Sequence, residues 1–480
     1  MRTPPSYSWR TDMHTINCQV LVVGAGPGGY VAAIRAGQLG LDTVIVDAGS
    51  AGGTCLTRGC IPSKALIHAA GEFAAASSAH AAVRFGIRLP SAPQMDMSTF
   101  QDWKDGVVNR LGRGVEGLLK KSHVRRLHGW ARFLDGKTCE VTGDGEPLQV
   151  HAEHVILATG AEPRELPELP FSSRILDSTA ALGLTEVPRR LAIVGAGYIG
   201  LELGIAFRKL GSEVILLEAQ ERILPGYDEE LTRPVAAWLD RHGVTSHVGA
   251  TLRGCTETTD GVTLHTAVGG EDIDLTADYT LVNIGRKPRY DGWGFENLCV
   301  DREGDFVRID ARCHTSMHNV WAVGDITGEP QLAHRASAQG SLVAEIIAGQ
   351  RGRFEPACIP AICFTEPEIV SVGLSPEAAQ ATGHDIIVAK HPFLAIGRAL
   401  AMGAGDDGGF VRIVARKDNH LVLGIQAVGT HIAELAGEFG LALEMGTRLE
   451  DLAGTIHTHP SLGEGIAEAA LGGLGRALHA

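Results

Sequence analysis

The feature that most constrains the fold of this chain is an internal repeat. An apolar strand pattern that ends in the turn Gly24–Gly26 recurs before Gly195–Gly197, at an offset of 171 residues. A third glycine in each copy, Gly29 and Gly200, keeps the same offset. Each copy reads as a buried strand, a glycine turn, a helix and a second strand. The pattern therefore predicts a βαβ unit that occurs twice.

The glycines of each turn have separate physical tasks. The first allows the tight turn, the second lets a pyrophosphate approach the backbone, and the third lets the helix pack closely on its strand. The pyrophosphate then lies at the helix N-terminus, where unpaired N–H groups and the helix dipole favour anions. The predicted nucleotide-binding glycines are Gly24, Gly26 and Gly29 in the first copy and Gly195, Gly197 and Gly200 in the second.

Each copy ends its second strand on an acidic residue. Asp47 and Glu218 each lie 23 residues past the first glycine of their turn. A carboxylate at that position can accept hydrogen bonds from the hydroxyls of a ribose. Two glycine turns with correctly placed acids are much stronger evidence than one, so we expect two bound dinucleotides and an electron path between them.

Length and composition exclude several classes of protein. The chain has 480 residues, 9 cysteines and a formal charge of −14. The acidic balance argues against nucleic-acid binding, and no uncharged apolar run approaches the ~18 residues of a membrane span. The cysteines are too sparse for a secreted disulfide scaffold, and residues 1–17 lack the apolar core of a signal peptide. We expect a cytoplasmic protein, with an organellar matrix as the alternative.

The order of these patterns predicts the domain organisation. The second βαβ unit is inserted into the first domain, whose chain returns near Ile284, and the composition changes after about Gly349. The predicted fold class is α/β, with two Rossmann-like dinucleotide-binding domains, one inserted in the other, and a C-terminal α+β domain. The expected parts are an N-terminal extension at 1–17, a first nucleotide-binding domain at 18–160 and 284–350, a second at 161–283, and the α+β domain at 351–480.

A pair of cysteines follows the first βαβ unit. Cys55 and Cys60 are separated by four residues within segment 52–64. In a regular α-helix their Cα atoms would be about 8.6 Å apart, whereas a disulfide needs less than ~7 Å. A bridge therefore requires a distorted turn, which Gly59 would permit. From the spacing alone, two buried thiols or an inert bridge are open alternatives.

Segment 52–64 resembles the redox-active site of the FAD-dependent pyridine nucleotide-disulfide oxidoreductases. The resemblance covers about residues 18–470 and, within the family, is strongest to the dihydrolipoamide dehydrogenases through segments 61–64, 332–336 and 459–464. It implies FAD as tightly bound cofactor, NAD as co-substrate, and a dihydrolipoyl group as reductant. The implied partners are the lipoyl domains of a 2-oxo acid dehydrogenase complex or of a glycine cleavage system.

The resemblance implies roles for the reactive residues near the first glycine turn. Cys60 would lie nearer the flavin, as a thiolate in charge transfer with it, and Cys55 would exchange with the sulfurs of the substrate. Lys64 would lie near the flavin nitrogen that accepts hydride, paired with Glu202 where the nicotinamide stacks. Burying a lone Lys or Glu is costly, so such a pair is physically sensible. A solvated helix acid is the alternative for Glu202.

The resemblance also implies a histidine–glutamate pair near the C-terminus. His459 would take a proton from the dithiol, oriented by Glu464 five residues further on. The residue pattern alone favours an ordinary structural histidine, because the chain has 20 of them. In the family the last domain forms a two-fold interface and delivers its histidine to the other subunit. We therefore expect an obligate homodimer.

The family pattern adds further cofactor contacts, and no metal site is expected. Asp325 would bind the ribityl chain of FAD, and Asp47 its adenosine ribose. The implied FAD contacts beyond the glycines are Asp47, Gly53, Thr54, Lys64, Ala131, Thr159, Gly160, Asp325, Ala333 and His334. The implied NAD contacts beyond the glycines are Glu202, Glu218 and Gly285.

Some residues depart from the family pattern or resemble it misleadingly. Thr57-Arg58 replaces the common Asn-Val, and Asp47 replaces the more usual Glu. Cys358 and Cys363 repeat the spacing of the redox cysteines, but no dinucleotide turn precedes them. We interpret these two as small buried hydrophobic residues.

Two other functions are alternatives to the dehydrogenase. An NADPH-dependent reductase of the glutathione type would want arginines where the second βαβ unit ends, and Glu218 would instead repel a 2′-phosphate. A component that holds FAD without turnover would not need intact Cys55, Cys60 and His459.

Overall fold

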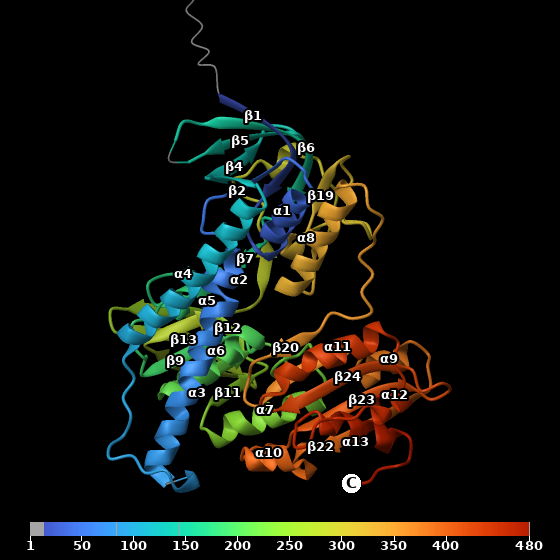
Figure 1. Cartoon of the computed structure of the whole chain (residues 1–480). Coiled ribbons are helices and arrows are strands. Elements are labelled where there is room, and N and C mark those ends of the chain that lie inside the picture. Colours follow the sequence, from blue (N-terminus) through green and yellow to red (C-terminus); the bar gives the residue numbers. More distant parts are fainter. Residues whose placement is uncertain (1–13, 83, 144, 480) are drawn as a thin grey trace, which may run out of the picture. The chain divides into compact units, whose positions relative to one another are not determined.

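The computed structural model describes residues 14–82, 84–143 and 145–479, and the chain divides into two compact units (Figure 1). Residues 1–13 of the expected N-terminal extension lie outside the described residues. Two of the boundaries between these units, after Pro62 and after Gln101, fall inside the long helices α3 (Cys60–Ala82) and α4 (Met97–Lys121). Unit 1 comprises Met1–Pro62, Asp102–Pro163 and Arg286–Glu355, and unit 2 comprises Ser63–Gln101, Arg164–Gly285 and Pro356–Ala480.

Unit 1 contains a seven-stranded sheet in the order β3-β2-β1-β6-β5-β4, with β19 beside β6. β3, β2, β1, β6 and β19 run parallel, and the central strands of this set are apolar on both faces, as a parallel sheet covered on both sides requires. β4 and β5 are antiparallel. The strands are β1 (His14–Val23), β2 (Thr43–Asp47), β3 (Arg125–His128), β4 (Trp130–Phe133), β5 (Thr138–Thr142), β6 (Leu148–Leu157) and β19 (Val320–Ala322).

β1 begins earlier than the apolar pattern predicts. Residues His14–Asn17, assigned to the extension from the sequence, pair in parallel with Leu148–His151 of β6. These residues are largely polar, so their strand is defined by the backbone ladder with β6 and not by hydrophobic alternation. β19, which follows the second nucleotide-binding fold in the chain, also pairs with β6. The second fold is therefore inserted into the first, as predicted.

Helices α1 (Pro27–Gln38) and α8 (Ala333–Ile347) pack together in unit 1 at glycine positions. A Cβ on Gly340 would lie 2.3 Å from the carbonyl oxygen of Gly28, so the two helix backbones are as close as glycine allows. Other elements of this unit are α2 (Gly53–Arg58), β7 (Ala161–Pro163), β16 (Arg286–Pro288), β17 (Arg302–Glu303) and β18 (Phe306–Val307).

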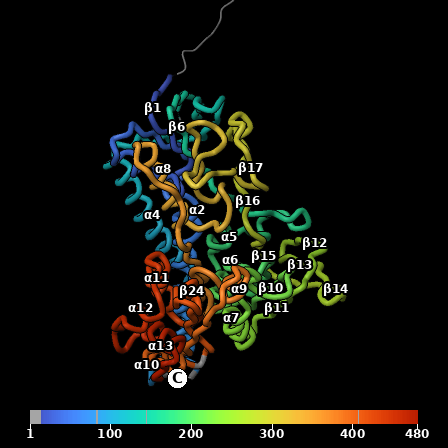
Figure 2. The backbone as a smooth tube through the Cα atoms, turned by 90° about the vertical axis from the view of Figure 1, so that its right-hand side faces the viewer, coloured from blue at the N-terminus to red at the C-terminus, as the bar shows by residue number. Residues whose placement is uncertain are grey.

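Unit 2 contains a parallel sheet in the order β11-β10-β9-β15-β8 and an antiparallel three-stranded sheet, β12-β13-β14, which Figure 2 shows beside it. Its helix α6 is buried along most of its length. The strands are β8 (Ile175–Leu176), β9 (Arg190–Val194), β10 (Glu213–Glu218), β11 (Thr245–Val248), β12 (Thr251–Thr258), β13 (Gly261–Val268), β14 (Glu271–Ala277) and β15 (Tyr279–Val282). The helices are α5 (Ser178–Leu182), α6 (Tyr198–Leu210) and α7 (Glu229–Arg241).

The C-terminal part of unit 2 is an antiparallel sheet in the order β20-β21-β24-β23-β22, with helices packed on it. Together with the two parallel sheets it confirms the predicted fold class. The strands are β20 (Ala361–Cys363), β21 (Glu368–Gly373), β22 (Ile386–Pro392), β23 (Phe410–Arg416) and β24 (Val422–Gly429). The helices are α9 (Pro376–Ala381), α10 (Gly397–Ala401), α11 (Ala436–Glu444), α12 (Leu449–Gly454) and α13 (Glu464–Gly473).

A buried arginine joins the C-terminal sheet to the second nucleotide-binding fold. Arg412 of β23 is 2% exposed and donates to Glu230 at 2.9 Å, with Asp228 at 3.4 Å. Both acids lie at the start of α7. Burying a charge this deeply requires such partners, which ties the two parts of unit 2 together. Within the described ranges, no helix is long and apolar enough to cross a membrane.

Candidate active site

The first nucleotide-binding fold (β1, α1 and β2) has the open glycine turn that a pyrophosphate needs. Gly24 has a φ of +100°, and an added Cβ would lie 2.3 Å from the oxygen of Ala158. At Gly26 an added Cβ would meet no atom within 4 Å. Gly26 caps α1 without any side-chain hydrogen bond, so no side chain competes for the first N–H groups of the helix. These groups fit a bound FAD pyrophosphate.

Asp47 is held beside this turn by two backbone donors. Its Oδ2 accepts a hydrogen bond from Ala25 N, and its Oδ1 accepts one from Gly49 N, both at 2.6 Å. The carboxylate is thus fixed at the end of β2 with lone pairs left for ribose hydroxyls.

The second nucleotide-binding fold (β9, α6 and β10) repeats this geometry. Gly195 has a φ of +101°, Gly197 faces open space, and no side chain caps α6. Glu218 is buried and accepts hydrogen bonds from Ala196 N at 2.7 Å and Gln220 N at 2.8 Å. Gly285, the other predicted NAD contact, has a φ of +108°. The turn and its acid fit a second dinucleotide.

The cysteine segment begins against the first glycine turn. Gly53, the first residue of α2, has a φ of +59°, and an added Cβ would lie 2.4 Å from Gly26 Cα. α2 ends at Arg58, Gly59 follows with non-helical angles (φ −138°, ψ −104°), and α3 starts at Cys60. The helix is therefore broken between the two cysteines, where a bridge requires distortion. Cys55 is half-buried and Cys60 is exposed.

The other predicted FAD contacts are distributed over unit 1. Asp325 lies in a short turn after β19. Burial raises the pKa of its carboxyl, and the charges of Arg286 and Arg335 oppose that rise. Thr54 lies in α2, Ala131 is buried in β4, and Ala333 and His334 begin α8. The carbonyl oxygen of Gly160 accepts from Arg289 N at 3.1 Å, and the Thr159 hydroxyl donates to the oxygen of Arg289 at 3.4 Å.

Lys64 and Glu202 form the expected ion pair within unit 2. Lys64 Nζ of α3 lies 2.8 Å from Glu202 Oε2 of α6. Glu202 is 3% exposed, so it is not a solvated helix acid. A carboxylate buried this deeply needs a cation and further donors to offset its desolvation.

A third residue completes this ion pair, and the sequence did not reveal it. Phe364, after β20, donates its backbone N–H to Glu202 Oε1 at 3.0 Å, and its ring centroid lies 4.4 Å from Lys64 Nζ. A lone phenylalanine far along the chain carries no pattern that could have signalled these contacts. The adjacent Cys363 is fully buried, and burial raises its pKa to about 12. Burial thus disfavours the thiolate of Cys363, as expected for a small buried residue, whereas Cys358, which was also predicted to be buried, is only half-buried.

His459 and Glu464 form a hydrogen-bonded pair at the start of α13. His459 Nδ1 lies 2.7 Å from Glu464 Oε1, and Ser461 N donates to Glu464 Oε2 at 2.8 Å. Burial opposes ionisation of Glu464, but these hydrogen bonds and the nearby histidines bring its pKa below the usual range. The His459 side chain is 80% exposed. With Nδ1 held by Glu464, Nε2 is left to meet a substrate.

The predicted residues thus form two groups. Unit 1 brings the cysteines together with the first glycine turn and Asp47. Unit 2 holds the second glycine turn with Glu218, the Lys64–Glu202 pair and the His459–Glu464 pair. In the described parts of the chain, no cluster of three or more His, Cys, Asp or Glu side chains could hold a metal ion.

Known proteins resemble the chain over nearly its full length. Residues 18–340 match the pyridine nucleotide-disulphide oxidoreductase family, and residues 359–470 match its dimerisation domain. The chain is 54% identical to dihydrolipoyl dehydrogenase of Pseudomonas aeruginosa, over 97% of the chain and 99% of that protein. It is 43% identical to dihydrolipoyl dehydrogenase of Geobacillus stearothermophilus, over 97% of the chain and 98% of that protein.

Solved structures agree with this relationship. LpdA from Mycobacterium tuberculosis superposes with a TM-score of 0.87 at 25% identity, over 94% of this chain and 99% of that chain. The HOCl-induced flavoprotein disulfide reductase RclA from Escherichia coli superposes with a TM-score of 0.83 at 26% identity, over 94% and 99%. The chain belongs to the pyridine nucleotide-disulphide oxidoreductase family and, within it, groups with the dihydrolipoyl dehydrogenases.

Proposed function

We propose that this chain oxidises dihydrolipoyl groups and reduces NAD through a redox disulfide between Cys55 and Cys60. The observation that carries this proposal is the exposed His459, held at 2.7 Å by Glu464 in a dimerisation domain. A base that takes protons from a dithiol needs this combination of access and orientation. The identity with named dihydrolipoyl dehydrogenases supports the choice of substrate.

His459 starts the reaction as a general base. Its Nε2 takes a proton from one thiol of the substrate, while Glu464 stabilises the imidazolium through Nδ1. The substrate thiolate attacks Cys55 Sγ, the Cys55–Cys60 bond breaks, and Cys60 leaves as a thiolate. The second substrate thiol then displaces Cys55 and closes the oxidised ring. Two electrons now reside on the two cysteines, and the net reaction is dihydrolipoamide + NAD⁺ ⇌ lipoamide + NADH + H⁺.

FAD and NAD are the cofactors of this family, and FAD when bound supplies two-electron transfer from the dithiol to NAD⁺. The first glycine turn and Asp47 would hold FAD, and the second turn and Glu218 would hold NAD. Both Glu218 oxygens already accept backbone hydrogen bonds. The fixed negative charge favours ribose hydroxyls and opposes a 2′-phosphate, which supports NAD over NADP.

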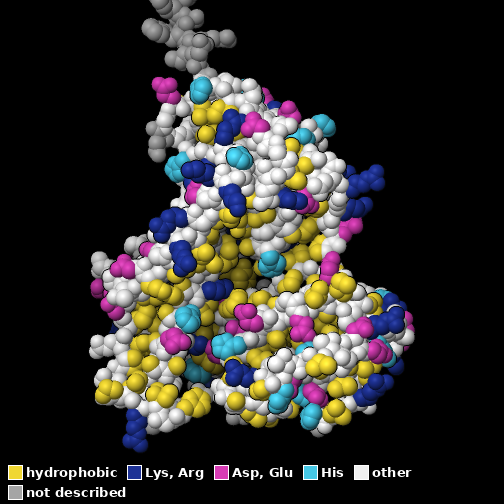
Figure 3. Space-filling view, in the orientation of Figure 1, with side chains coloured by type: hydrophobic (Ala, Val, Ile, Leu, Met, Phe, Trp, Pro, Cys, Tyr) yellow, Lys and Arg dark blue, Asp and Glu magenta, His cyan; other side chains and the backbone are white. Residues whose placement is uncertain are grey.

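The dimerisation domain supports a homodimer. Figure 3 shows hydrophobic side chains among acidic ones over α11, and Leu441 of this helix and Met445 just after it are exposed. Apolar side chains gathered on the surface of a dimerisation domain support contact with another subunit. Beyond this, we propose that His459 serves the cysteines of the other subunit, that lipoyl domains are the partners, and that the enzyme works in the cytoplasm.

Subunit mixing tests the composite site. Cys60→Ser and His459→Gln are each expected to lower dihydrolipoamide turnover by more than about 100-fold. A mixed dimer would contain one site with both residues intact and one with neither. After random exchange, activity should recover towards about a quarter of wild type, because half the dimers are mixed and each has one good site.

Mass spectrometry of the mixture shows whether subunits have exchanged. If they have exchanged and no activity returns, the histidine does not act across the interface. If either single variant keeps normal turnover, the proposed disulfide mechanism is wrong.

A further inference from the structure

The turn that carries His459 contains a second histidine with opposite surroundings. This histidine turn, residues 455–463, joins α12 to α13. The side chain of His459 is 80% exposed, whereas that of His457 is 8% exposed. The two histidines lie only two positions apart, but the ring of His459 faces solvent and the ring of His457 is held inside the domain.

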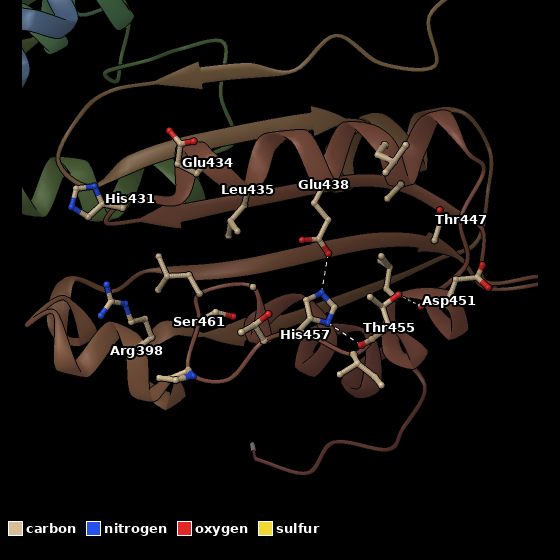
Figure 4. A pocket seen from close by; sticks show the side chains of 18 of the residues that line it. Arg398, His431, Glu434, Leu435, Glu438, Thr447, Asp451, Thr455, His457 and Ser461 are labelled. Carbon is tan, nitrogen blue, oxygen red and sulfur yellow. Dashed lines mark hydrogen bonds and ion pairs between the residues drawn. The ribbon is translucent and has the colours of Figure 1, made fainter.

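His457 is bonded through both of its ring nitrogens. Nε2 lies 2.8 Å from Glu438 Oε1 of α11, and Nδ1 lies 3.0 Å from the carbonyl oxygen of Thr455, as Figure 4 shows. The carboxylate and the carbonyl hold the ring at two points, and the contact with Glu438 ties the histidine turn to α11.

The same ring also contacts the far end of the turn. A Cβ on Gly463 would lie 3.4 Å from His457 Cδ2, so the ring packs against the residue just before Glu464. His457 thus lies two residues before His459 and against the neighbour of Glu464. A pocket of about 940 Å³, lined by Glu434, Glu438 and His457 among others, opens beside it.

We propose that His457, held by Glu438, is a positioning residue for the His459–Glu464 pair. It touches neither substrate nor cofactor, and it sets the distance between base and orienting acid by fixing both ends of the histidine turn. This inference rests on the proposed function, in which His459 takes protons from the dithiol. A catalytic base displaced by as little as ~1 Å can lose a large factor in rate.

The test uses the full-length, FAD-loaded enzyme with Glu438→Gln, His457→Gln and the control Glu434→Gln. Glu434 lines the same pocket, just before α11. Two reactions are compared: dihydrolipoamide with NAD, and NADH with ferricyanide, which requires no proton transfer from a dithiol. We expect Glu438→Gln and His457→Gln to lower kcat for dihydrolipoamide by about 10-fold or more, with KM little changed. Their ferricyanide rates and the control should match wild type.

Two results would overturn the proposal. One is normal dihydrolipoamide turnover in both variants at full FAD content. The other is an equal fall of both reactions, which would indicate general damage to the fold. His459→Gln, measured in parallel, separates this proposal from the proposed function. If His459→Gln is inactive and the other two variants are normal, only the positioning role fails. If His459→Gln is itself normal, the proposed base is wrong.

Discussion

Gly24 and Gly195 open two nucleotide-binding folds whose backbones are nearly identical and whose surroundings differ. Their φ angles are +100° and +101°, and each amide donates at 2.8 Å to the strand that carries the acid. Asp47 and Glu218 accept from equivalent backbone donors in the two folds. Both folds therefore share the same dinucleotide-binding geometry, a glycine turn with an acid held beside it, although the two dinucleotides have different roles.

The two folds differ in the segments that follow β2 and β10. Gly52 and Leu224 occupy equivalent positions, because each donates its backbone N–H to the alanine of its glycine turn, to Ala25 O at 2.9 Å and to Ala196 O at 3.0 Å. Both have positive φ angles, of +113° and +47°. In the first fold an added Cβ at Gly52 would lie 2.6 Å from the Leu56 side chain, and one at the next residue, Gly53, would lie 2.4 Å from Gly26 Cα. In the second fold leucine fits and is buried in the core. The first fold thus has two consecutive glycines where the cysteine segment begins against its glycine turn, and the second fold has a buried leucine there.

The largest expected effect comes from closing the helix–strand contact in each fold. An alanine Cβ at Gly29 would lie 1.8 Å from the oxygen of Gly24, and one at Gly200 would lie 2.3 Å from the oxygen of Gly195. Backbone atoms cannot rotate away, so Gly29→Ala should destabilise the fold by about 3 kcal/mol or more. We expect it to lose most of its FAD absorbance, whereas Gly200→Ala keeps FAD and raises KM for NAD.

Gly71→Ala serves as the matched control, because an added Cβ there meets nothing within 4 Å. It should keep FAD, activity and melting temperature. Retention of FAD by Gly29→Ala together with its loss by Gly200→Ala would reverse the assignment of the two cofactors.

The next effect concerns a carboxylate that only the second fold has. Glu202 occupies the position on α6 that Val31 occupies on α1. Glu202→Gln removes the charge that pairs with Lys64 but keeps an acceptor for Phe364 N. We expect FAD content to stay normal and NADH–ferricyanide turnover to fall about 10- to 100-fold, or ~1.4–2.8 kcal/mol.

The control for this prediction is Lys209→Gln, which breaks another ion pair on the same helix, with Glu366. Its turnover should be unchanged. Equal losses in the two variants would mean that ion pairs on α6 act only through stability.

Comparing the two folds also shows what a sequence can predict. The glycines and acids were predictable because their spacing follows from the local geometry of a βαβ unit. Helix dimensions and the reach of a disulfide require a break near Gly59 only if Cys55 and Cys60 are bridged, and the redox bridge was implied by the family resemblance and not by the spacing. The contacts of Phe364 and His457 were not predictable, because they depend on tertiary packing between elements far apart in the chain. Likewise, the polar start of β1 is set by its ladder with β6 and leaves no hydrophobic pattern.

A smaller effect should distinguish the roles of Glu218 and Asp47. Glu218→Ala removes a charge that favours NAD, so the ratio of kcat/KM for NAD over NADP should fall by about 10- to 100-fold, from ~1–3 kcal/mol of charge-assisted hydrogen bonding. Asp47→Asn should weaken FAD retention in gel filtration and leave the nucleotide preference unchanged. A change of preference in Asp47→Asn would contradict the division of roles.

The smallest effect concerns how the second fold is anchored, since its helix α7 is tied to Arg412 of the C-terminal sheet. Partial burial raises the pKa of Glu230, but the hydrogen bonds and charges of Lys390 and Arg412 outweigh this and lower it below its ordinary value of 4.5. A carboxyl whose folded pKa is lowered stabilises the protein above its unfolded pKa, and this stability is lost as the pH falls through the folded pKa.

Glu230→Gln should therefore reduce the melting temperature most at neutral pH, and the difference from wild type should shrink below about pH 4.5. We expect about 1 kcal/mol, below the ~3–5 kcal/mol typical of a broken buried pair, because solvent screens the charge of the 38% exposed Glu230 side chain and Asp228 still faces Arg412. Asp418→Asn, in the exposed pair with Arg416, should leave the melting temperature unchanged. A pH-independent loss in Glu230→Gln would show that Glu230 acts through packing and not through its charge.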